Sequence, residues 1–459
     1  MLKYNFIIYI IITLTPCYGQ TRGVQIIYSN PLKYALIAPQ SFKPVLLNEP
    51  GNYHFSSGTN VDFITSGTII NITSNNVTIN LQNFTLSQKN AGSSNKNITG
   101  INIADGLSNI TIKNGNINNI TGTAIIMGQN CFNITLNNLT IAQARSGGIE
   151  VQTGTDTMFI NNCFAGKSLT NKKNNFGLSL TSNKNITVHN CSFIGVRAPT
   201  GYNAFGITAT NCIDCSINNC AINNNSGDTV SGLHLNNCIA FEVDNIETNG
   251  NSSSVGGAAG IECSGGQGNT FKNSTSFYNT AATNSRGIYF HSNASYNQVF
   301  DCTTSCQKVL TTGNASGICI TTGTSNCFTR ITSFGNTGGS LTTSKGCGII
   351  LSNTYGVIVD HSTCNYNNGG TGKGYGIHLI NTSRCIIEEN KLYYNHGTAG
   401  SWGIQEEENS LSFLASNIAF GNAINYGVTH STLNSIQQIN FKSSRSSLKD
   451  NRGNIDVTT

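Results

Sequence analysis

A glycine followed by an apolar, a variable and a second apolar residue recurs through most of the chain. From Gly177 to Gly403 the starts of this pattern are 26 to 31 residues apart, and two further starts near Gly67 and Gly122 have an altered register. Self-similarity at such a period indicates stacked structural units rather than separate globular domains. The regular starts are Gly100, Gly148, Gly177, Gly206, Gly232, Gly260, Gly287, Gly317, Gly348, Gly376, Gly403 and Gly427.

A second alternating stretch follows many of these glycines, as at Ile186-Thr187-Val188 and Val357-Ile358-Val359. Alternation with a period of two in pieces this short is typical of β-strands. A strand of a few residues cannot bury its apolar face alone, so neighbouring units must share one core. We therefore predict an all-β fold, a right-handed parallel β-helix solenoid of about 12–14 coils over residues 67–430.

The turn after the second strand carries asparagine and then cysteine in consecutive slots. Asparagine tolerates the left-handed backbone of a sharp turn, and stacked amides can hydrogen-bond along the axis. Cysteine in the next slot is expected to point inward as a small apolar residue. Disulfide bonds are the alternative, because Cys212, Cys215 and Cys220, or Cys302 and Cys306, are close in sequence. The predicted ladder consists of Asn162, Asn190, Asn219, Asn245 and Asn273, with Cys163, Cys191, Cys220 and Cys302.

The first residues have the pattern of an export signal. Lys3 precedes an apolar run over residues 6–14, and small residues lie near Gly19. The pattern predicts a signal peptide over residues 1–19, removed on export to the medium, the cell surface or the periplasm. A lipid anchor at Cys17 is the alternative. The apolar run is too short to span a bilayer, so no transmembrane segment is expected in the mature chain.

The composition stays rich in Asn, Gly, Ser and Thr throughout, which predicts one repetitive body between two ends. Residues 20–66 are expected to form an N-terminal cap and first strand, and residues 431–459 a polar C-terminal cap or tail. Only 10% of the residues are charged and the net charge is +5, so nucleic acid is not expected as a partner. One basic cluster, expected to be solvated, comprises Lys442, Arg445, Lys449 and Arg452.

The repeat, the asparagine ladder and the Pro50-Gly51-Asn52-Tyr53 segment resemble the right-handed β-helix superfamily of pectate lyases and polygalacturonases, and its Asn-rich bacterial repeat proteins. The resemblance implies polysaccharide chemistry on the outer face of the coil, using carboxylates and sometimes calcium or an arginine. Asp360-His361 and Arg197-Ala198-Pro199 are similar to lyase motifs, but the first falls in a turn slot and the second in an inter-coil loop. We therefore expect no cofactor, with calcium only if the chain is an enzyme.

The variable position of the repeat should point outward, so that successive coils place these residues in one column about 4.8 Å apart. His234, Glu262 and Tyr289 then become neighbours, with His291 further along its strand. A carboxylate between these rings could transfer protons and the rings could stack on a sugar; an ordinary polar surface is the alternative. The column reads Glu150, Ser179, Thr208, His234, Glu262, Tyr289, Cys319, Ile350, His378 and Gln405.

A run of three acidic residues, Glu406, Glu407 and Glu408, is a candidate cation site, with a solvated surface as the alternative. No cysteine and histidine spacing indicates zinc.

Two functions fit these patterns. The first is a non-catalytic exported β-helix that presents a rigid surface for adhesion, envelope structure or glycan binding, because the fold pattern is strong while no motif gathers acids or metal ligands. The alternative is a polysaccharide lyase, hydrolase or epimerase acting near Glu262. In both, the expected partner is a polysaccharide or a cell-surface glycan. The oligomeric state is left open.

Overall fold

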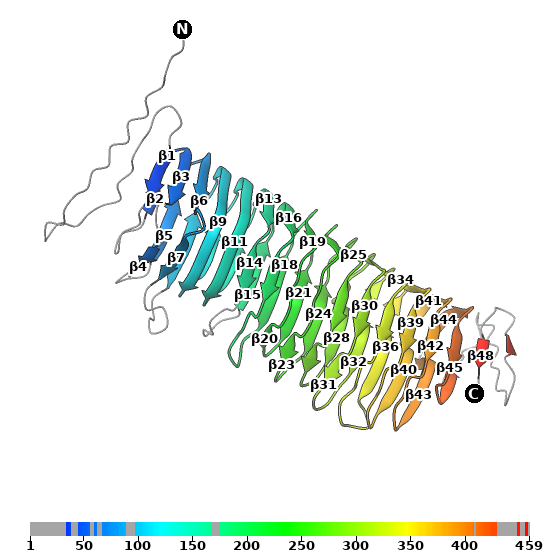
Figure 1. Ribbon diagram of the computed structural model, residues 1–459. Helices are drawn as coiled ribbons and strands as arrows, with labels where there is room; N and C mark the ends of the chain where they lie inside the picture. Colours follow the sequence, from blue (N-terminus) through cyan, green and yellow to red (C-terminus); the bar gives the residue numbers. More distant parts are fainter. Residues whose placement is uncertain are drawn as a thin grey trace, which may run out of the picture.

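The computed structural model describes residues 45–55, 67–88, 97–166, 175–407 and 410–428, together with four short strands at 34–37, 59–61, 448–449 and 455–457. These residues form strands and turns that coil repeatedly about one long axis, from β2 at one end to β45 near the other (Figure 1). All strand pairs are parallel except one, β47 with β48. The predicted all-β, right-handed parallel β-helix is confirmed.

The sheet that carries the candidate site has fifteen strands and receives one strand from each coil. It has one rung more than the fourteen glycine starts, because β2 pairs with β5 but lacks the glycine. Its strands are β2 (Val45–Leu47), β5 (Gly67–Ile72), β8 (Ile98–Ile103), β10 (Thr123–Met127), β12 (Gly147–Val151), β15 (Asn175–Thr181), β18 (Ala204–Thr210), β21 (Val230–Asn236), β24 (Ala258–Ser264), β28 (Ser285–His291), β32 (Ala315–Ile320), β36 (Lys345–Ser352), β40 (Lys373–Ile380), β43 (Gly400–Glu407) and β46 (Ile424–Val428).

A second sheet of twenty-one strands closes another side of the coil. Its strands are β1 (Tyr34–Ile37), β3 (Gly51–Phe55), β4 (Thr59–Val61), β6 (Val77–Asn80), β7 (Thr85–Gln88), β9 (Ser108–Ile120), β11 (Phe132–Ala144), β13 (Asp156–Asn161), β14 (Phe164–Gly166), β16 (Lys184–His189), β17 (Ser192–Ile194), β19 (Ser216–Asn218), β22 (Glu242–Asp244), β25 (Thr270–Lys272), β29 (Gln298–Phe300), β33 (Gly323–Thr324), β34 (Cys327–Thr329), β37 (Thr354–Tyr355), β38 (Ile358–Asp360), β41 (Ser383–Glu388) and β44 (Leu411–Ala415).

Two shorter sheets complete the later coils. One has eight strands: β26 (Thr275–Phe277), β30 (Thr303–Ser305), β35 (Thr332–Phe334), β39 (Thr363–Asn365), β42 (Lys391–Tyr393), β45 (Ile418–Phe420), β47 (Leu448–Lys449) and β48 (Ile455–Val457). The other has four: β20 (Ser226–Gly227), β23 (Ser252–Ser253), β27 (Thr280–Ala281) and β31 (Lys308–Val309).

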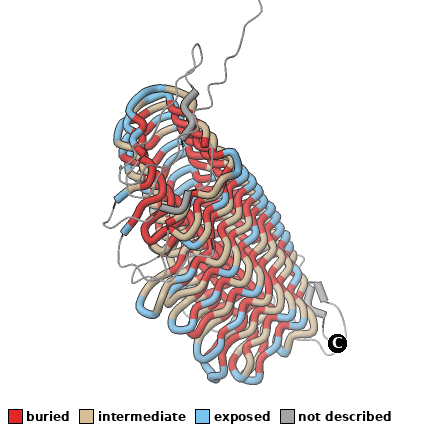
Figure 2. Tube along the Cα trace, turned by 60° about the vertical axis from the view of Figure 1, so that its left-hand side comes forward, coloured by how far each residue is buried: buried red, intermediate tan, exposed pale blue. Residues whose placement is uncertain are grey.

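The recurrent glycines stack because the backbone of the next coil leaves no room for a side chain. A Cβ atom on Gly232 would lie 2.7 Å from the carbonyl oxygen of Gly260, and one on Gly206 would meet Gly232 at the same distance. The apolar residues on either side of the variable position are buried from β5 to β40 (Figure 2). Phenylalanines reinforce this core, where Phe271 and Phe290 pack edge to face with centroids 5.5 Å apart.

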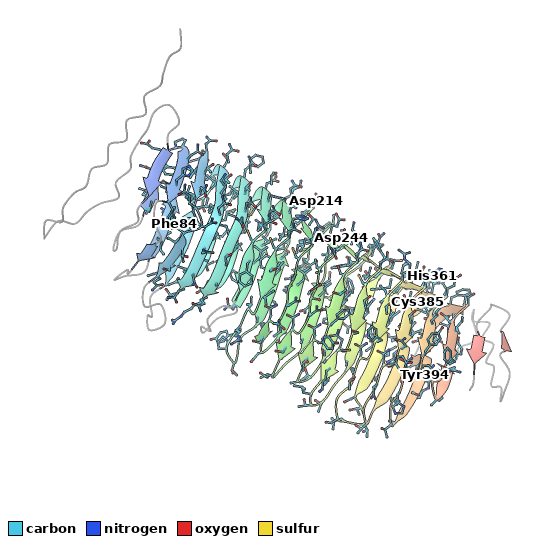
Figure 3. The ribbon with its side chains drawn as sticks, viewed as in Figure 1. Phe84, Asp214, Asp244, His361, Cys385 and Tyr394 are labelled. Atoms are coloured by element: carbon cyan, nitrogen blue, oxygen red, sulfur yellow. The ribbon has the colours of Figure 1, made fainter. Side chains whose placement is uncertain are left out.

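The asparagine ladder occupies a turn of left-handed backbone. Asn162, Asn190, Asn219, Asn245 and Asn273 have φ between 51° and 55°. The Asn245 amide donates to Oδ1 of Asn219 at 2.7 Å. The same slot continues as Asp301, Arg330, His361 and Glu389, also at positive φ. Figure 3 shows His361 on the same long edge of the solenoid as Asp244, next to the ladder.

A second, buried amide ladder lies inside another corner, and the sequence patterns did not predict it. Asn251 donates from its side chain to Oδ1 of Asn279 at 3.0 Å, and Asn279 donates to Oε1 of Gln307 at 3.0 Å. The ladder resumes from Asn336 to Asn367 at 2.7 Å. These amides satisfy buried backbone groups at a bend where an apolar side chain would leave them unpaired.

The cysteines of the described chain are free thiols, fifteen in number. Cys163, Cys191, Cys220 and Cys302 point inward and are at most 3% exposed. Burial raises the pKa of the Cys302 thiol to about 12. These side chains therefore pack as small apolar residues.

Some predictions lie outside the described residues. They are the signal peptide over residues 1–19 with the lipid anchor at Cys17, Glu408, and the structure of most of the two ends. The described part of the chain holds no helix that is both long and apolar enough to cross a membrane.

Candidate functional site

The outward column has the predicted register. Glu150 pairs with Ser179, Thr208 with His234, His234 with Glu262, and Glu262 with Tyr289. The pairing continues through Cys319, Ile350, His378 and Gln405. These four side chains are at most 5% exposed, so the prediction of an outward column is wrong for them, and the column is partly exposed only from Glu150 to Tyr289. His234, Glu262 and Tyr289 therefore occupy three consecutive rungs, on β21, β24 and β28.

Six side chains converge on these three rungs and form what we term the Glu262 cluster: Ser231, His234, Glu262, Arg286, Tyr289 and His291. Oε1 of Glu262 lies 3.0 Å from Nε2 of His291. The Ser231 hydroxyl donates to Oε2 of the same carboxylate. The Glu262 side chain is 16% exposed and that of His291 is 23% exposed. The pair therefore forms a partly buried dyad that solvent still reaches.

The rings of the cluster are layered. Tyr289 and His291 stack with centroids 4.5 Å apart and an interplanar angle of 17°. The guanidinium carbon of Arg286 lies 3.9 Å from the centroid of the Tyr289 ring. A phenol, an imidazole and a guanidinium thus share one small patch of the outer face.

The electrostatics of the dyad favour an ionised carboxylate. Burial alone would raise the pKa of Glu262, but the hydrogen bond from His291, the nearby charge of His234 and the Ser231 hydroxyl outweigh it and bring the pKa to about 2. An ionised carboxylate can only accept hydrogen bonds. Nε2 of His291 therefore carries a hydrogen.

His234 is partly buried beside the dyad. Its ring stacks on Phe205 at 5.1 Å, and Nδ1 lies 3.3 Å from the Thr208 hydroxyl. Burial lowers its pKa, while the charge of Glu262 opposes the shift. The ring therefore forms one wall of the cluster.

A shallow hollow of about 420 Å³ adjoins the cluster at the corner where β24 and β28 end. Ser292 lines it and lies 2.9 Å from Nδ1 of His291 through its hydroxyl. Asn237, Gln267 and the exposed ring of Tyr296 line it as well. Amides, hydroxyls and one aromatic ring are groups that bind sugars.

The acidic run at the end of β43 differs from the expectation of a solvated surface. Glu406 is 2% exposed because strand alternation turns it inward, in the column of Leu379. Burial raises the pKa of Glu406 to about 7. Glu407 faces outward, where Oε2 lies 3.3 Å from Nε2 of His378 and 3.9 Å from Nζ of Lys345.

The two described carboxylates of that run therefore point to opposite sides of one strand and do not fit a calcium site. Within the described residues, no group of three or more His, Cys, Asp or Glu side chains could hold a metal ion.

The two lyase-like fragments lie away from the cluster. His361 has φ 48° in the turn ladder, and Nε2 lies 2.6 Å from Oε2 of Glu389. Arg197 forms a parallel bridge with Ser226 beside the four-stranded sheet. Neither contributes a side chain to the Glu262 cluster.

Sequence patterns missed Arg286 and Ser231. In β28 the alternation breaks after Gly287, so that Arg286 and Tyr289, three residues apart, are both partly exposed while Ile288 is buried. Strict alternation from Tyr289 would have turned Arg286 inward. The glycine that opens each repeat could have indicated this break, because glycine within a strand often marks a bulge or a close backbone approach.

No family model matches the sequence, and no curated protein does. Similar solved structures include a periplasmic alginate epimerase, with 10% identity and a TM-score of 0.45 over 73% of this chain and 78% of that chain. The A-module of a mannuronan C-5 epimerase from Azotobacter vinelandii has 12% identity and a TM-score of 0.38 over 85% of this chain and 90% of that chain. The Dettilon tailspike protein has 10% identity and a TM-score of 0.34 over 86% and 61%. Similarity at this level does not indicate an activity for this chain.

Proposed function

We propose that the chain binds an acidic polysaccharide on the outer face of the fifteen-stranded sheet and removes the C5 proton of a uronic acid residue at the Glu262 cluster. The observation that carries this proposal is the convergence of Arg286, Tyr289 and the Glu262–His291 dyad on neighbouring rungs. Removing a proton next to a carboxylate needs a base and a cation that stabilises the developing negative charge. The cluster holds both.

Each side chain has a distinct role in this proposal. Within the described chain Arg286 forms no salt bridge, so its charge can pair with the carboxylate of the sugar. His291 accepts the C5 proton at Nδ1 after Ser292 yields that position. Glu262 is a positioning residue, because its ionised carboxylate orients the ring and stabilises the imidazolium that forms.

The electron pair of the broken C5–H bond moves into the carboxylate group to give an enolate-like intermediate beside Arg286. Two reactions of this intermediate conserve all atoms. In elimination, the C4–O bond breaks and the Tyr289 phenol protonates the departing oxygen, leaving a C4–C5 double bond. In epimerisation, water on the solvent side of the sugar returns a proton to C5 from the opposite face, and the hydroxide left takes the proton that His291 holds, because Tyr289 stacks on His291 and lies on the same side as the base. Both begin with the same proton removal.

Hydrolysis fits the cluster less well. A glycosidase pairs a protonated carboxylic acid with a second carboxylate roughly 5 to 10 Å away. Glu262 is the cluster's one carboxylate, and with a pKa of about 2 it is ionised at neutral pH and cannot be the acid.

Non-catalytic glycan binding is the second candidate, and one observation favours it. Nε2 of His291 lies against Glu262 and Nδ1 against Ser292, so the chain's own side chains already occupy both ring nitrogens. In this alternative the sheet presents the same rings and charges for recognition only. Exported location is part of both candidates and depends on the predicted signal peptide.

A panel of polyuronates tests the proposal. The protein should generate either the ultraviolet absorbance of an unsaturated uronate or a changed ratio of C5 epimers by NMR. Glu262→Gln should lower either rate at least about 100-fold, and a neutral glucan should show no change. Binding to polyuronates without either product would favour the non-catalytic candidate and contradict the proposal.

A further inference from the structure

A second group of side chains lies on the same face, towards the C-terminal end, and the proposed chemistry does not use it. We term it the Trp402 cluster: Lys345, Lys373, Tyr375, His378, Trp402 and Glu407. We propose that it is a remote binding subsite for the same acidic polysaccharide, with a sugar ring on Trp402 and an acid group at the two lysines. This inference rests on the proposed acidic polysaccharide but not on catalysis.

The rings of the Trp402 cluster form a rigid platform. Tyr375 stacks on Trp402 with centroids 5.1 Å apart and on His378 with centroids 4.2 Å apart. Tyr375 and His378 are fully buried, whereas Trp402 is partly exposed. The two buried rings thus fix the indole from behind. A fixed, partly exposed indole can stack on a sugar ring without losing side-chain entropy on binding.

Two lysines lie beside this platform. Lys345 and Lys373 pair in register on adjacent rungs, and Nζ of Lys373 lies 5.3 Å from the Trp402 centroid. Glu407 offsets one of these charges, because its carboxylate contacts Lys345 and His378. Burial lowers the pKa of His378, which keeps that ring neutral. The described side chains therefore leave one positive charge beside the indole.

The two clusters share one straight path. Pairing runs from Glu262 through Tyr289, Cys319, Ile350 and His378 to Gln405, which is five rungs or about 24 Å. Between the clusters, Cys319 and Ile350 are each 5% exposed and belong to a buried apolar group against which the partly exposed rings of Tyr289 and Trp402 pack. A stretched glycan of several sugars is long enough to contact Tyr289 at one end of this distance and Trp402 at the other.

Charge complementarity favours an acidic glycan over a neutral one, because the lysines add an attraction that neutral sugars cannot use. A chain that engages both clusters also gains from effective concentration, since binding at one cluster holds the chain near the other. Long oligosaccharides should therefore bind more tightly than short ones, and the gain in affinity should exceed what their additional contacts alone would give.

The chain has a single tryptophan, so its fluorescence reports directly on this cluster. Trp402 emission is titrated with oligouronates of two to ten sugars and with neutral oligoglucans of equal length. Acidic oligomers should give a saturable change that is at least ten-fold weaker in the Lys345→Gln/Lys373→Gln variant. The double variant Lys308→Gln/Lys391→Gln removes two exposed lysines on β31 and β42 of other sheets and is the control for net charge. The neutral oligomers should give no change.

The proposed subsite is contradicted if acidic oligomers leave Trp402 emission unchanged, or if the Lys345→Gln/Lys373→Gln variant binds them as tightly as the unchanged chain does. The same titration with Glu262→Gln separates the two proposals. A Trp402 response without C5 chemistry in the unchanged chain would reject the catalytic function and keep the subsite. C5 chemistry without a Trp402 response would reject the subsite alone.

Discussion

Oε1 of Glu262 and Nε2 of His291 lie 3.0 Å apart across two adjacent rungs, one on β24 and the other on β28. Neither residue would meet the other in an isolated coil, since 29 residues separate them along the chain. The stacking of coils alone brings them together. The proposed chemistry therefore depends on the register in which consecutive coils stack.

Ionisation of Glu262 should make the stability of the fold depend on pH in the acid range. Because the pKa of Glu262 falls from its usual 4.5 to about 2 in the folded chain, it stabilises the fold above pH 4.5 and loses that contribution between pH 4.5 and pH 2. The loss is at most about 3 kcal/mol. Urea unfolding midpoints of Glu262→Gln should therefore lie below those of the unchanged chain at pH 7 and approach them at pH 2. Glu150→Gln, in the same column, is the control, and a constant difference across this range would contradict the dyad.

Glu406 and Glu407 should respond to pH in opposite directions although they are adjacent. The pKa of Glu406 is raised to about 7, so the folded chain holds a proton that the unfolded chain releases, and stability falls between pH 4.5 and pH 7. The thermal midpoint of Glu406→Gln minus that of the unchanged chain should therefore be more positive at pH 8 than at pH 4. In Glu407→Gln the effect should reverse, because His378 and Lys345 lower the pKa of Glu407 to about 2. Shifts of the same sign in both variants would show that the two side chains do not face opposite ways.

The inner amide ladder should contribute more to stability than the outer one. Asn279 accepts from Asn251 and donates to Gln307 in the interior, so Asn279→Ala leaves buried polar groups unpaired and should cost about 1–3 kcal/mol. Asn245→Gly keeps the left-handed turn at an exposed position and should cost a few tenths of a kcal/mol. Equal destabilisation of both variants in chemical unfolding would contradict this ranking.

Tyr289 and His291 should matter for turnover more than for binding. Tyr289→Phe removes the hydroxyl but keeps the ring that stacks on His291, so kcat for elimination on a polyuronate should fall about 100-fold or more with a small change in KM. Phe205→Leu, behind His234, alters a ring that does not touch the dyad and serves as the control. A Tyr289→Phe variant that changes KM alone would assign the phenol to sugar binding.

The glycine pattern alone predicts the outward column, because one repeat per coil fixes which residues share a register. Strict alternation along the strand misplaces Arg286, which faces outward because the alternation breaks at Gly287, where the backbone packs closely against Gly317; the glycine itself could have indicated this break. Glu406 occupies the second apolar slot of its repeat, so the pattern could have indicated its burial, but its charge suggested a surface. The stack of Tyr375 on Trp402 depends on side-chain direction in two coils and lies beyond any single repeat.

Exchange of the C5 hydrogen tests the central claim most directly. A polyuronate is incubated with the protein in heavy water, and deuterium at C5 is measured by NMR in the polymer and in any unsaturated fragments. Deuterium at C5, or elimination in its place, should appear with the unchanged chain and fall at least about 100-fold in Glu262→Gln and in His291→Asn. Binding of the polymer with neither C5 deuterium nor an unsaturated product would contradict proton removal at the Glu262 cluster.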